Sequence, residues 1–248
     1  MRNFFRRIWS LWFAFWLVGY FLLMLPIYGL VLARLTPLTT RIGHQLNRLW
    51  GKLILFMGGI RVHVKGYYFP SEPCIIVANH RSYLDIPICY AIFPPRVAFL
   101  GKAELARIPL YGWTYRRLHV IVDRGDFHAR TKSLLQVARK LKEGISVLIY
   151  PEGTTKHTLP LGKFYDGAFM MAKELNVPLL PLVISGSNDC LSADGRFLMQ
   201  PGKITCIFHP LIFPDEETVE SLRNKVYEWM KQTLVAYENR LTPIGHPV

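Results

Sequence analysis

The hydrophobic pattern divides the chain near residue 58. An apolar run without a formal charge extends over 26 residues, from Ile8 to Ala33. As a helix it would be about 39 Å long, which is enough to cross a bilayer. It carries aromatic residues of the kind that favour membrane interfaces, namely Trp12, Trp16, Tyr20 and Tyr28. The run therefore predicts a membrane-embedded helix.

The flanks of this run leave its orientation open. Basic residues stand on both sides, including Arg7 before it and Arg34 after it, so the positive-inside rule selects neither orientation. Pro26 should kink the helix, and a bent helix that enters one leaflet and returns would place both flanks on one side. The alternative of a cleaved signal peptide fits less well, because its apolar core has only about 7–15 residues.

A second amphipathic segment follows. Its apolar residues recur at intervals of four and three, at Ile42, Leu46, Leu49, Leu53 and Phe56. This spacing predicts a helix with one apolar stripe. Arg48 and Lys52 lie together beside the stripe. The pattern is equally typical of a helix lying on an anionic membrane and of a helix packed on a globular core.

From Gly59 onward, short β-rich runs alternate with helical patterns. The predicted strands are 61–65, 74–78, 97–100, 119–122, 146–150, 179–185 and 204–208, and the predicted helices are 83–93, 127–143, 166–175 and 216–239. Such alternation predicts an α/β fold with a mixed, mostly parallel sheet flanked by helices. We therefore divide the chain into membrane-anchoring helices over 1–58 and an α/β domain over 59–248.

Composition narrows the class of protein. Of 248 residues, 51% are hydrophobic and 19% are charged. The high apolar share excludes intrinsic disorder. The charged share is lower than the roughly 25% that is usual in soluble domains. The net charge of +13 indicates a phosphate-bearing or acidic partner. The apolar N-terminus favours an anionic membrane over nucleic acid. No CxxC or HExxH pattern occurs, so neither a disulfide framework nor a metal site is expected.

One heptapeptide, Asn79 to Asp85, carries candidate chemistry. It follows the apolar strand 74–78, where α/β folds place reactive groups. His80 and Asp85 can meet if His80 stays in the loop and Asp85 lies in the first helical turn, with Ser82 as a candidate N-cap. The pair would then be the His–Asp half of a catalytic triad. The alternative is a capping box formed by Ser82 and Asp85, with His80 a plain loop residue.

The missing triad member is informative. No GxSxG nucleophile elbow occurs in the chain. A His–Asp pair without a protein nucleophile suits a reaction in which a hydroxyl of the substrate attacks.

Three further strand exits carry candidate groups. Gly153 and Thr154 follow the strand 146–150, and their N–H groups are candidates for binding an oxyanion or a phosphate. The alternative is that these residues only form the turn at the end of the strand. Arg124 follows the strand 119–122 and is a candidate phosphate ligand or a surface ion-pair partner. Lys102 follows the strand 97–100 and is either a phosphate ligand or a solvated lysine.

Taken together and in order, these blocks resemble the glycerolipid acyltransferases, in particular the 1-acyl-sn-glycerol-3-phosphate acyltransferases. The resembling segments are 79–85 (the family's NHxSxxD), 120–124, 150–154 (usually FPEGT) and 177–182, with further similarity at 101–105 and 108–113. The resemblance spans roughly residues 60–210.

The resemblance implies roles for these residues. His80 is the general base and Asp85 orients it. Glu152, Gly153 and Thr154 shape the acceptor and oxyanion site. The phosphate of the acceptor is bound by Lys102 and Arg124, with Lys156 as a further candidate. The donor is an acyl thioester of CoA or acyl carrier protein, the acceptor is a lysophospholipid, and no metal or cofactor is needed.

One departure affects the choice of acceptor. The family's third block often continues with arginine, whereas this chain has Thr155 followed by Lys156. Lysophosphatidic acid is the first expected acceptor, and another lysolipid is the alternative. A CoA-independent transacylase with the same His–Asp pair and a non-enzymatic membrane-binding protein are the competing hypotheses. We expect a membrane location with the active site facing the cytoplasm.

Overall fold

The computed structural model describes residues 2–66, 69–109, 111–122, 129–155, 161–194, 196–215 and 217–241. Its strands are β1 (Ile60–Lys65), β2 (Ile75–Ala78), β3 (Val97–Lys102), β4 (Val120–Val122), β5 (Ser146–Ile149), β6 (Leu179–Ser185) and β7 (Gly202–Phe208). Its helices are α1 (Arg2–Leu32), α2 (Pro37–Met57), α3 (Asp85–Ile92), η1 (Ala103–Arg107), α4 (Tyr111–Leu118), α5 (Ala129–Lys142), α6 (Gly167–Leu175), α7 (Ser187–Cys190) and α8 (Val219–Leu241).

The described strands form one seven-stranded sheet in the order β1-β7-β6-β2-β5-β3-β4. Strands β6, β2, β5, β3 and β4 run parallel, whereas β7 pairs antiparallel with β6 and parallel with β1. The predicted mixed, mostly parallel sheet is therefore confirmed. The carboxyl ends of β2, β5, β3 and β4 consequently lie along one edge of the sheet.

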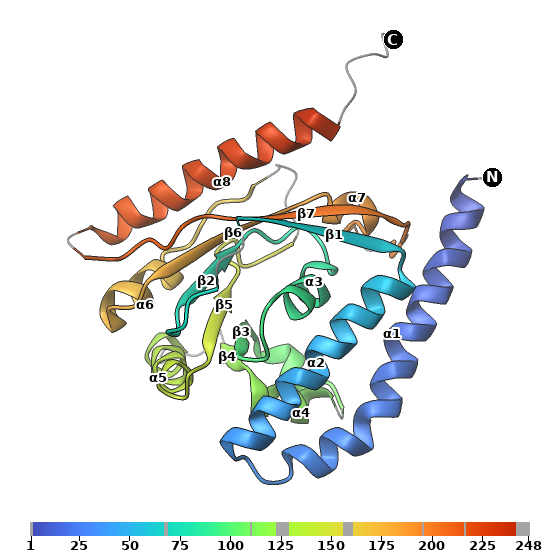
Figure 1. The fold of residues 1–248 in the computed structure, drawn as a ribbon, viewed down its shortest axis with the longest axis horizontal. Helices are drawn as coiled ribbons and strands as arrows, with labels where there is room; N and C mark the ends of the chain where they lie inside the picture. The colour runs from blue at the N-terminus through green and yellow to red at the C-terminus, as the bar shows by residue number, and fades with distance from the viewer. Residues whose placement is uncertain are drawn as a thin grey trace.

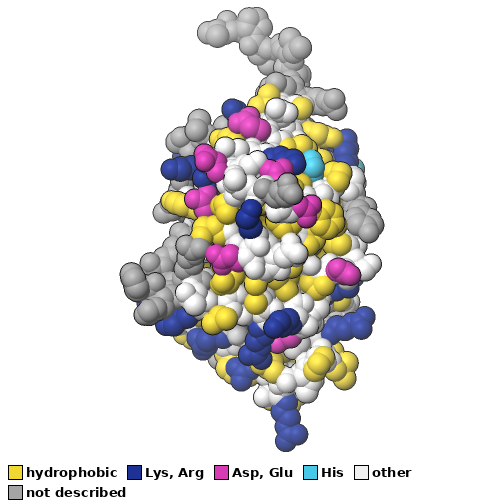
Figure 2. All heavy atoms as spheres, turned by 90° about the vertical axis from the view of Figure 1, so that its left-hand side faces the viewer, with side chains coloured by type: hydrophobic (Ala, Val, Ile, Leu, Met, Phe, Trp, Pro, Cys, Tyr) yellow, Lys and Arg dark blue, Asp and Glu magenta, His cyan; other side chains and the backbone are white. Residues whose placement is uncertain are grey.

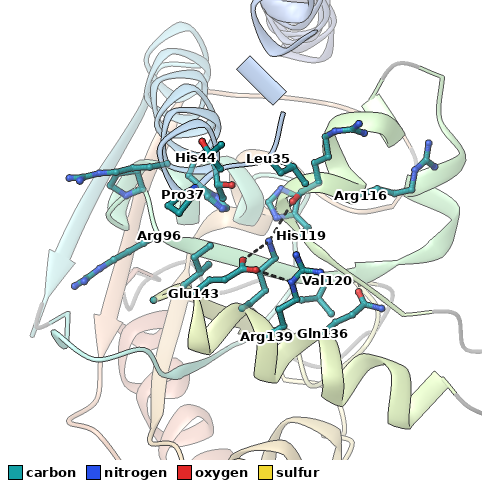
Figure 3. Close-up of a pocket in the computed structure, with 18 of the residues that line it drawn as sticks. Leu35, Pro37, His44, Arg96, Arg116, His119, Val120, Gln136, Arg139 and Glu143 are labelled. Carbon is teal, nitrogen blue, oxygen red and sulfur yellow. Dashed lines mark hydrogen bonds and ion pairs between the residues drawn. The ribbon is translucent and has the colours of Figure 1, made fainter. Parts of the chain in front are cut away.

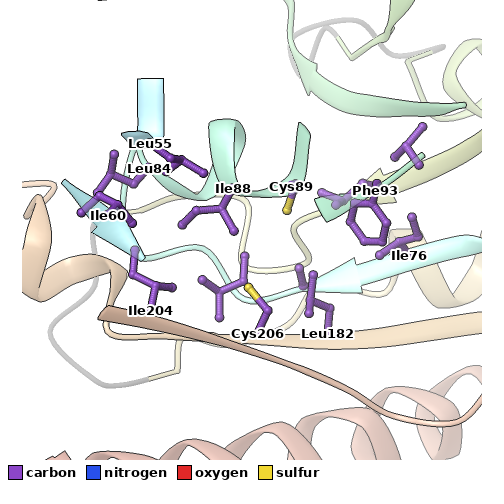
Figure 4. Packing of buried hydrophobic residues seen from close by; sticks show 14 of the residues in the cluster. Leu55, Ile60, Ile76, Leu84, Ile88, Cys89, Phe93, Leu182, Ile204 and Cys206 are labelled. Carbon is purple, nitrogen blue, oxygen red and sulfur yellow. The ribbon is translucent and has the colours of Figure 1, made fainter. Parts of the chain in front are cut away.

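The central strands are buried on both faces. In β2, Ile76 and Ala78 join a core with α3, while Ile75 and Val77 join a core with α5, α6 and α8. Figure 4 shows Ile88 of α3 facing the sheet in the first of these cores. Figure 1 shows α8 across the opposite face. Because successive side chains of a strand point to opposite faces, a continuous apolar run such as β2 fits between two helical layers.

The two N-terminal helices lie side by side at one side of the molecule (Figure 1). The indole of Trp9 donates to the carbonyl of Gly58 at 3.1 Å, and the hydroxyl of Tyr28 donates to Asn47 at 2.6 Å. Helix α1 continues through Pro26, so the expected kink does not interrupt the helix, although Figure 1 shows its last turns bending towards α2.

Much of the apolar surface of these helices is exposed. Residues 4–32 form one helix that is long and apolar enough to cross a membrane. The exposed apolar side chains of α1 are Phe4, Phe5, Ile8, Leu11, Trp12, Phe15, Val18, Leu22, Leu23, Ile27 and Leu30. The length and composition of α1 suggest membrane association.

Helix α2 presents two different faces. Its buried face contains Gly51 and Ile54 and packs on α3, where a Cβ at Gly51 would lie 2.6 Å from the carbonyl oxygen of Pro87. The predicted stripe lies on the other side, with Ile42, Leu49 and Phe56 exposed. Helix α2 therefore packs on the core and still exposes most of its apolar stripe, so the packed-helix alternative is confirmed for one face and contact of the stripe with a membrane stays a prediction.

The observed elements differ from the predicted ones mainly in the short helices. Neither η1 nor α4 was predicted, because residues 103–118 lack a sustained apolar period, and the four-residue α7 was not predicted either. Helix α3 begins at Asp85 rather than after Ser82.

Candidate active site

The loop between β2 and α3 brings the candidate chemistry to the carboxyl edge of the sheet. Buried Asn79 fixes the start of this loop: its amide donates to the carbonyl of Ile184 at 2.9 Å and accepts from the N–H of Ile184 at 2.7 Å. This pair of hydrogen bonds ties the loop to β6, at the residue before the last one of that strand. The sequence pattern included Asn79 but assigned it no role.

His80 and Asp85 meet as the sequence analysis predicts. Nδ1 of His80 lies 2.9 Å from Oδ2 of Asp85. Because an ionised carboxylate only accepts hydrogen bonds, Nδ1 carries the proton and Nε2 is the basic nitrogen. The side chain of His80 is 15% exposed and that of Asp85 is fully buried. The imidazole therefore stands between a buried carboxylate and the surface.

The Asp85 carboxylate also organises the loop itself. Its Oδ2 accepts the backbone N–H groups of Arg81 at 2.8 Å and Ser82 at 2.9 Å. Its Oδ1 is buried and has no hydrogen-bond partner among the described residues. One carboxylate oxygen thus holds the backbone and orients the imidazole at the same time.

Ser82 does not have the predicted role. The hydroxyl of Ser82 donates to the carbonyl of Leu191 at 2.6 Å and accepts from the N–H of Leu84 at 3.1 Å, but the helix begins only at Asp85. The expected N-cap at Ser82 is therefore wrong by two residues. The half of the capping box in which Asp85 accepts from the Ser82 N–H is present, so the capping interaction and the His–Asp pair coexist.

Glu152 connects this loop to the neighbouring strand exit. The residue is 3% exposed. Its Oε1 accepts the N–H of His80 at 2.7 Å and its Oε2 accepts the N–H of Gly162 at 2.6 Å. Hydrogen bonds from backbone N–H groups stabilise a buried carboxylate. Glu152 therefore holds the backbone of the candidate base, a connection that the spacing of the sequence did not reveal.

The turn after β5 accounts for Gly153. Gly153 has a φ of +65°, which glycine adopts readily, and its N–H donates to the carbonyl of Tyr150 at 3.0 Å. The N–H of Gly153 thus closes a turn, as the alternative expects, and a role of this N–H in binding an oxyanion stays a prediction. Thr154 is partly exposed at the same strand exit, and its role stays a prediction.

Of the three candidate phosphate ligands, Lys102 alone lies among the described residues. Lys102 is exposed at the end of β3, which is separated from β2 by β5 alone. With neighbouring strands about 4.8 Å apart, its backbone lies about 10 Å across the sheet from the end of β2. Arg124 and Lys156 lie outside the described residues.

Tyr150 is a site residue that the sequence analysis missed. Its ring stacks on the imidazole of His80 with centroids 4.0 Å apart and an interplanar angle of 15°. Burial raises the pKa of its phenol well above the ordinary value, so the ring stays neutral. The sequence signal that could have identified Tyr150 as a site residue is its position immediately before the Pro-Glu-Gly-Thr turn.

Metal ligands do not gather in the described part of the chain, where no group of three or more His, Cys, Asp and Glu side chains could hold an ion. The expectation of a reaction without a metal stays a prediction. What the arrangement offers chemically is an oriented imidazole base at a partly open sheet edge, beside a turn.

Comparison with known proteins supports this picture. The family model described as Acyltransferase matches residues 59–185, just over half of the chain. A 1-acyl-sn-glycerol-3-phosphate acyltransferase of Chlamydomonas reinhardtii is 29% identical over 178 residues, covering 70% of this chain and 53% of that protein. The chain thus spans about half the length of this relative. Its counterpart from Pseudomonas aeruginosa is 28% identical over 197 residues, covering 77% of this chain and 76% of that protein.

A solved structure agrees with the fold. The crystal structure of the 1-acyl-sn-glycerophosphate (LPA) acyltransferase PlsC from Thermotoga maritima superposes with a TM-score of 0.82 at 27% identity, covering 98% of this chain and all of that one. The resemblance identified from the ordered motifs is confirmed, and the chain belongs to the acyltransferase family.

Proposed function

We propose that this protein transfers a fatty acyl group from an acyl thioester to the sn-2 hydroxyl of 1-acyl-glycerol-3-phosphate. The observation that carries the proposal is the His80–Asp85 pair, held at 2.9 Å at the carboxyl edge of the sheet. The names of the relatives support the acceptor, since they are 1-acyl-sn-glycerol-3-phosphate acyltransferases.

In the proposed reaction, Nε2 of His80 takes the proton of the acceptor hydroxyl while Nδ1–H stays bound to Asp85. The hydroxyl oxygen attacks the thioester carbonyl and forms a tetrahedral intermediate. Its collapse breaks the carbon–sulfur bond, forms the ester and releases a thiolate, which receives the proton from His80. The acyl group passes directly to the acceptor, so no acyl-enzyme forms, and the thioester makes a metal or cofactor unnecessary.

The remaining candidates support this reaction in different ways. Glu152 positions His80 through the backbone, whereas Thr154 and the Gly153 turn border the acceptor hydroxyl. Lys102, Arg124 and Lys156 supply positive charge for the acceptor phosphate, since lysine and arginine are the usual phosphate ligands in proteins.

The exposed apolar faces of α1 and α2 support insertion of this helical hairpin into one leaflet of a membrane. An amphipathic hairpin of this kind binds by burying its apolar face, and exposed basic residues such as Lys52 favour anionic lipid. The active site then faces the cytoplasm, where it meets CoA or acyl carrier protein as soluble donors, while the lipid acceptor arrives from the membrane.

The test is acyl transfer from a labelled acyl-CoA or acyl carrier protein to a panel of lysolipids in detergent micelles. Wild type should acylate lysophosphatidic acid, and His80→Ala should lose about 10²–10⁴-fold in rate because the general base is removed. Retention of full activity by a folded His80→Ala variant would overturn the mechanism. Acyl exchange between phospholipids without a thioester would favour the transacylase instead.

One observation favours a second acceptor class. Thr155 stands where the family's third block often has arginine, which removes a ligand for a phosphate monoester. Transfer only to acceptors that lack a phosphate monoester would assign this alternative, and transfer to lysophosphatidic acid would exclude it.

A further inference from the structure

A large cavity lies at the sheet edge opposite to His80. It has a volume of about 860 Å³ and is walled by the residues that precede β3, β4 and β5, together with the start of α2 and the end of α5 (Figure 3). The six residue steps from Arg96 at its wall to Lys102 at the carboxyl edge span roughly 20 Å. The cavity is therefore separate from the candidate active site.

The lining of this cavity is strongly basic. Its described lining includes one carboxylate, that of Glu143, and six cationic side chains, namely Arg41, Arg96, Arg116, Arg117, Arg139 and Lys140. Glu143 pairs with Arg139 at 2.9 Å and with Lys140 at 3.6 Å. Figure 2 shows a face on which Lys and Arg side chains gather towards one end, where acidic side chains are sparse. Clustered like charges of this kind favour an anion.

Several of these cations are held in place without being neutralised. Arg96 donates to the carbonyl oxygen of Pro70 at 3.0 Å, and Arg117 donates to that of Leu32 at 2.9 Å while lying over the ring of Trp113. A carbonyl fixes a guanidinium but carries no compensating charge. The arginines are thus pre-positioned around the cavity, which lowers the entropic cost of binding an anion.

A second, independent observation concerns His44. This residue lines the cavity and is 3% exposed, and its Nε2 has no hydrogen-bond partner among the described residues. Burial and the charge of Lys140 lower the pKa of His44 to about 3, so the imidazole is neutral and carries one N–H donor. A buried polar atom without a partner is uncommon in folded proteins and calls for an explanation such as a bound ligand.

The rim of the cavity borders the apolar hairpin. One side is lined by Leu35 and Thr36, which lie between α1 and α2, and by Pro37, the first residue of α2. Leu35 is 52% exposed and Leu38 is 67% exposed. A ligand that places a negative group among the arginines would therefore have an apolar surface directly outside the cavity.

We propose that this cavity is a second phosphate-binding site, which takes the phosphate head group of an anionic membrane lipid whose acyl chains lie along the exposed face of the α1–α2 hairpin. Phosphate oxygens match the planar fork of arginine, and several arginines can share one phosphate. The proposal that the cavity binds a phosphate group does not depend on the proposed reaction. The proposal that this phosphate belongs to a lipid rests on the proposed membrane association of the α1–α2 hairpin.

The test measures binding without turnover, on the full chain in neutral detergent micelles. One arm titrates short-chain phosphatidylglycerol, which is neither acceptor nor product of the proposed reaction, and a second arm titrates inorganic phosphate. A third arm compares flotation with phosphatidylcholine vesicles and with vesicles that also contain phosphatidylglycerol. The pocket variant is Arg41→Gln/Arg139→Gln. Its matched control, Arg61→Gln/Lys203→Gln, removes the same charge from β1 and β7 at the far end of the sheet.

A second variant moves affinity in the opposite direction and so does not depend on damage to the fold. Glu143→Gln removes the carboxylate from the lining and should tighten phosphatidylglycerol binding about threefold, whereas the pocket variant should weaken it about tenfold or more and the control should change it less than twofold. Catalytic rate at saturating substrate should be unchanged in all three.

The outcomes separate the possible sources of phosphate. Variant-sensitive binding of phosphatidylglycerol that exceeds binding of inorganic phosphate supports the lipid site. Equal variant-sensitive binding of both probes overturns the lipid source and assigns a soluble phosphate. Equal losses in the pocket and control variants, or no effect of Glu143→Gln in any arm, overturn the site itself.

Discussion

The ring of Tyr150 lies parallel to the imidazole of His80, with the two centroids 4.0 Å apart. The two residues follow neighbouring strands, β5 and β2, so the sheet itself brings them together. The Tyr150 hydroxyl lies 3.6 Å from the sulfur of Cys89. The stack restrains the plane of the imidazole in which Nδ1 faces Asp85.

Replacing Tyr150 should therefore affect the orientation of the base. Aromatic pairs contribute about 0.5–1.5 kcal/mol beyond their buried area, so Tyr150→Leu should lower kcat up to about tenfold with little change in KM. Tyr150→Phe keeps the stack and removes only the contact with Cys89, and should stay within about twofold of wild type. An equal loss in both variants would show that the hydroxyl, and not the stack, is what matters.

The tautomer of His80 depends on Asp85. An amide in place of the carboxylate can donate to Nδ1, which moves the imidazole proton to Nε2 and removes the basic nitrogen from the reaction. By analogy with triads, Asp85→Asn should lower kcat by about 10³–10⁴-fold. Steady-state kinetics on the folded variant provide the check, because kcat should fall while the KM for the acceptor stays within about twofold. A fully active Asp85→Asn enzyme would contradict the assigned role.

Glu152 should act on the same base through the backbone. Both of its oxygens accept backbone N–H groups, from His80 and Gly162. Glu152→Gln leaves one of these buried donors facing an amide NH₂, and an unsatisfied buried donor costs about 1–3 kcal/mol. We expect a lower denaturation midpoint together with a lower kcat. Glu152→Asp, which restores the charge with a shorter reach, should recover part of the stability, whereas a purely substrate-binding role would change KM and leave stability intact.

The sequence predicted those features of the fold and the site that depend on residues close together in the chain. The seven strands follow from apolar runs, and the proximity of His80 to Asp85 follows from five-residue spacing across a loop and a helix start. The antiparallel pairing of β7 with β6 was not predictable in this way, since it depends on which distant segments meet.

The less predictable features are those that join distant segments. Glu152 reaches His80 across 72 positions of sequence, and the basic cavity gathers residues from positions 35 to 145. The exposure of the α2 stripe was not predictable either, because the helix buries a different face, with Gly51 and Ile54, which the spacing of the apolar stripe did not single out. Side-chain periodicity reports which residues share a face, and only tertiary structure reports what that face meets.

The close approach of α2 to α3 gives a prediction for stability. A methyl group at Gly51 would lie 2.6 Å from the carbonyl oxygen of Pro87 and 2.9 Å from the Cβ of Tyr90. Gly51→Ala should therefore destabilise the protein by about 1–3 kcal/mol through overpacking. Gly19→Ala is the matched control, because nothing lies within 4 Å of its Cβ position. Chemical denaturation in neutral detergent compares the two, and equal midpoints would contradict the tight contact.

Two buried histidines should make folding sensitive to acid. Nδ1 of His119 accepts the N–H of Phe99 at 3.1 Å and Nε2 donates to the hydroxyl of Tyr90 at 2.8 Å, which describes a neutral imidazole. Burial, with smaller contributions from His44 and Lys140, holds the pKa of His119 well below its ordinary value. Burial is also the main reason that the pKa of His44 falls to about 3.

The sign of the effect follows from proton uptake. Below a pH of about 6.5 the unfolded chain protonates these histidines while the folded protein does not, so acid favours unfolding by about 1.4 kcal/mol per pH unit for each group. In phosphate-free buffer, the denaturation midpoint should therefore decrease as the pH is lowered from 6.5 to 5. Well above pH 6.5, these two groups should make no contribution to the pH dependence of stability. His44→Leu removes one of the two groups without removing a hydrogen bond from Nε2. The slope of its unfolding free energy against pH should therefore be shallower by the contribution of about one proton. Parallel slopes in the variant and wild type would show that His44 is protonated in the folded protein, contrary to its buried position beside Lys140.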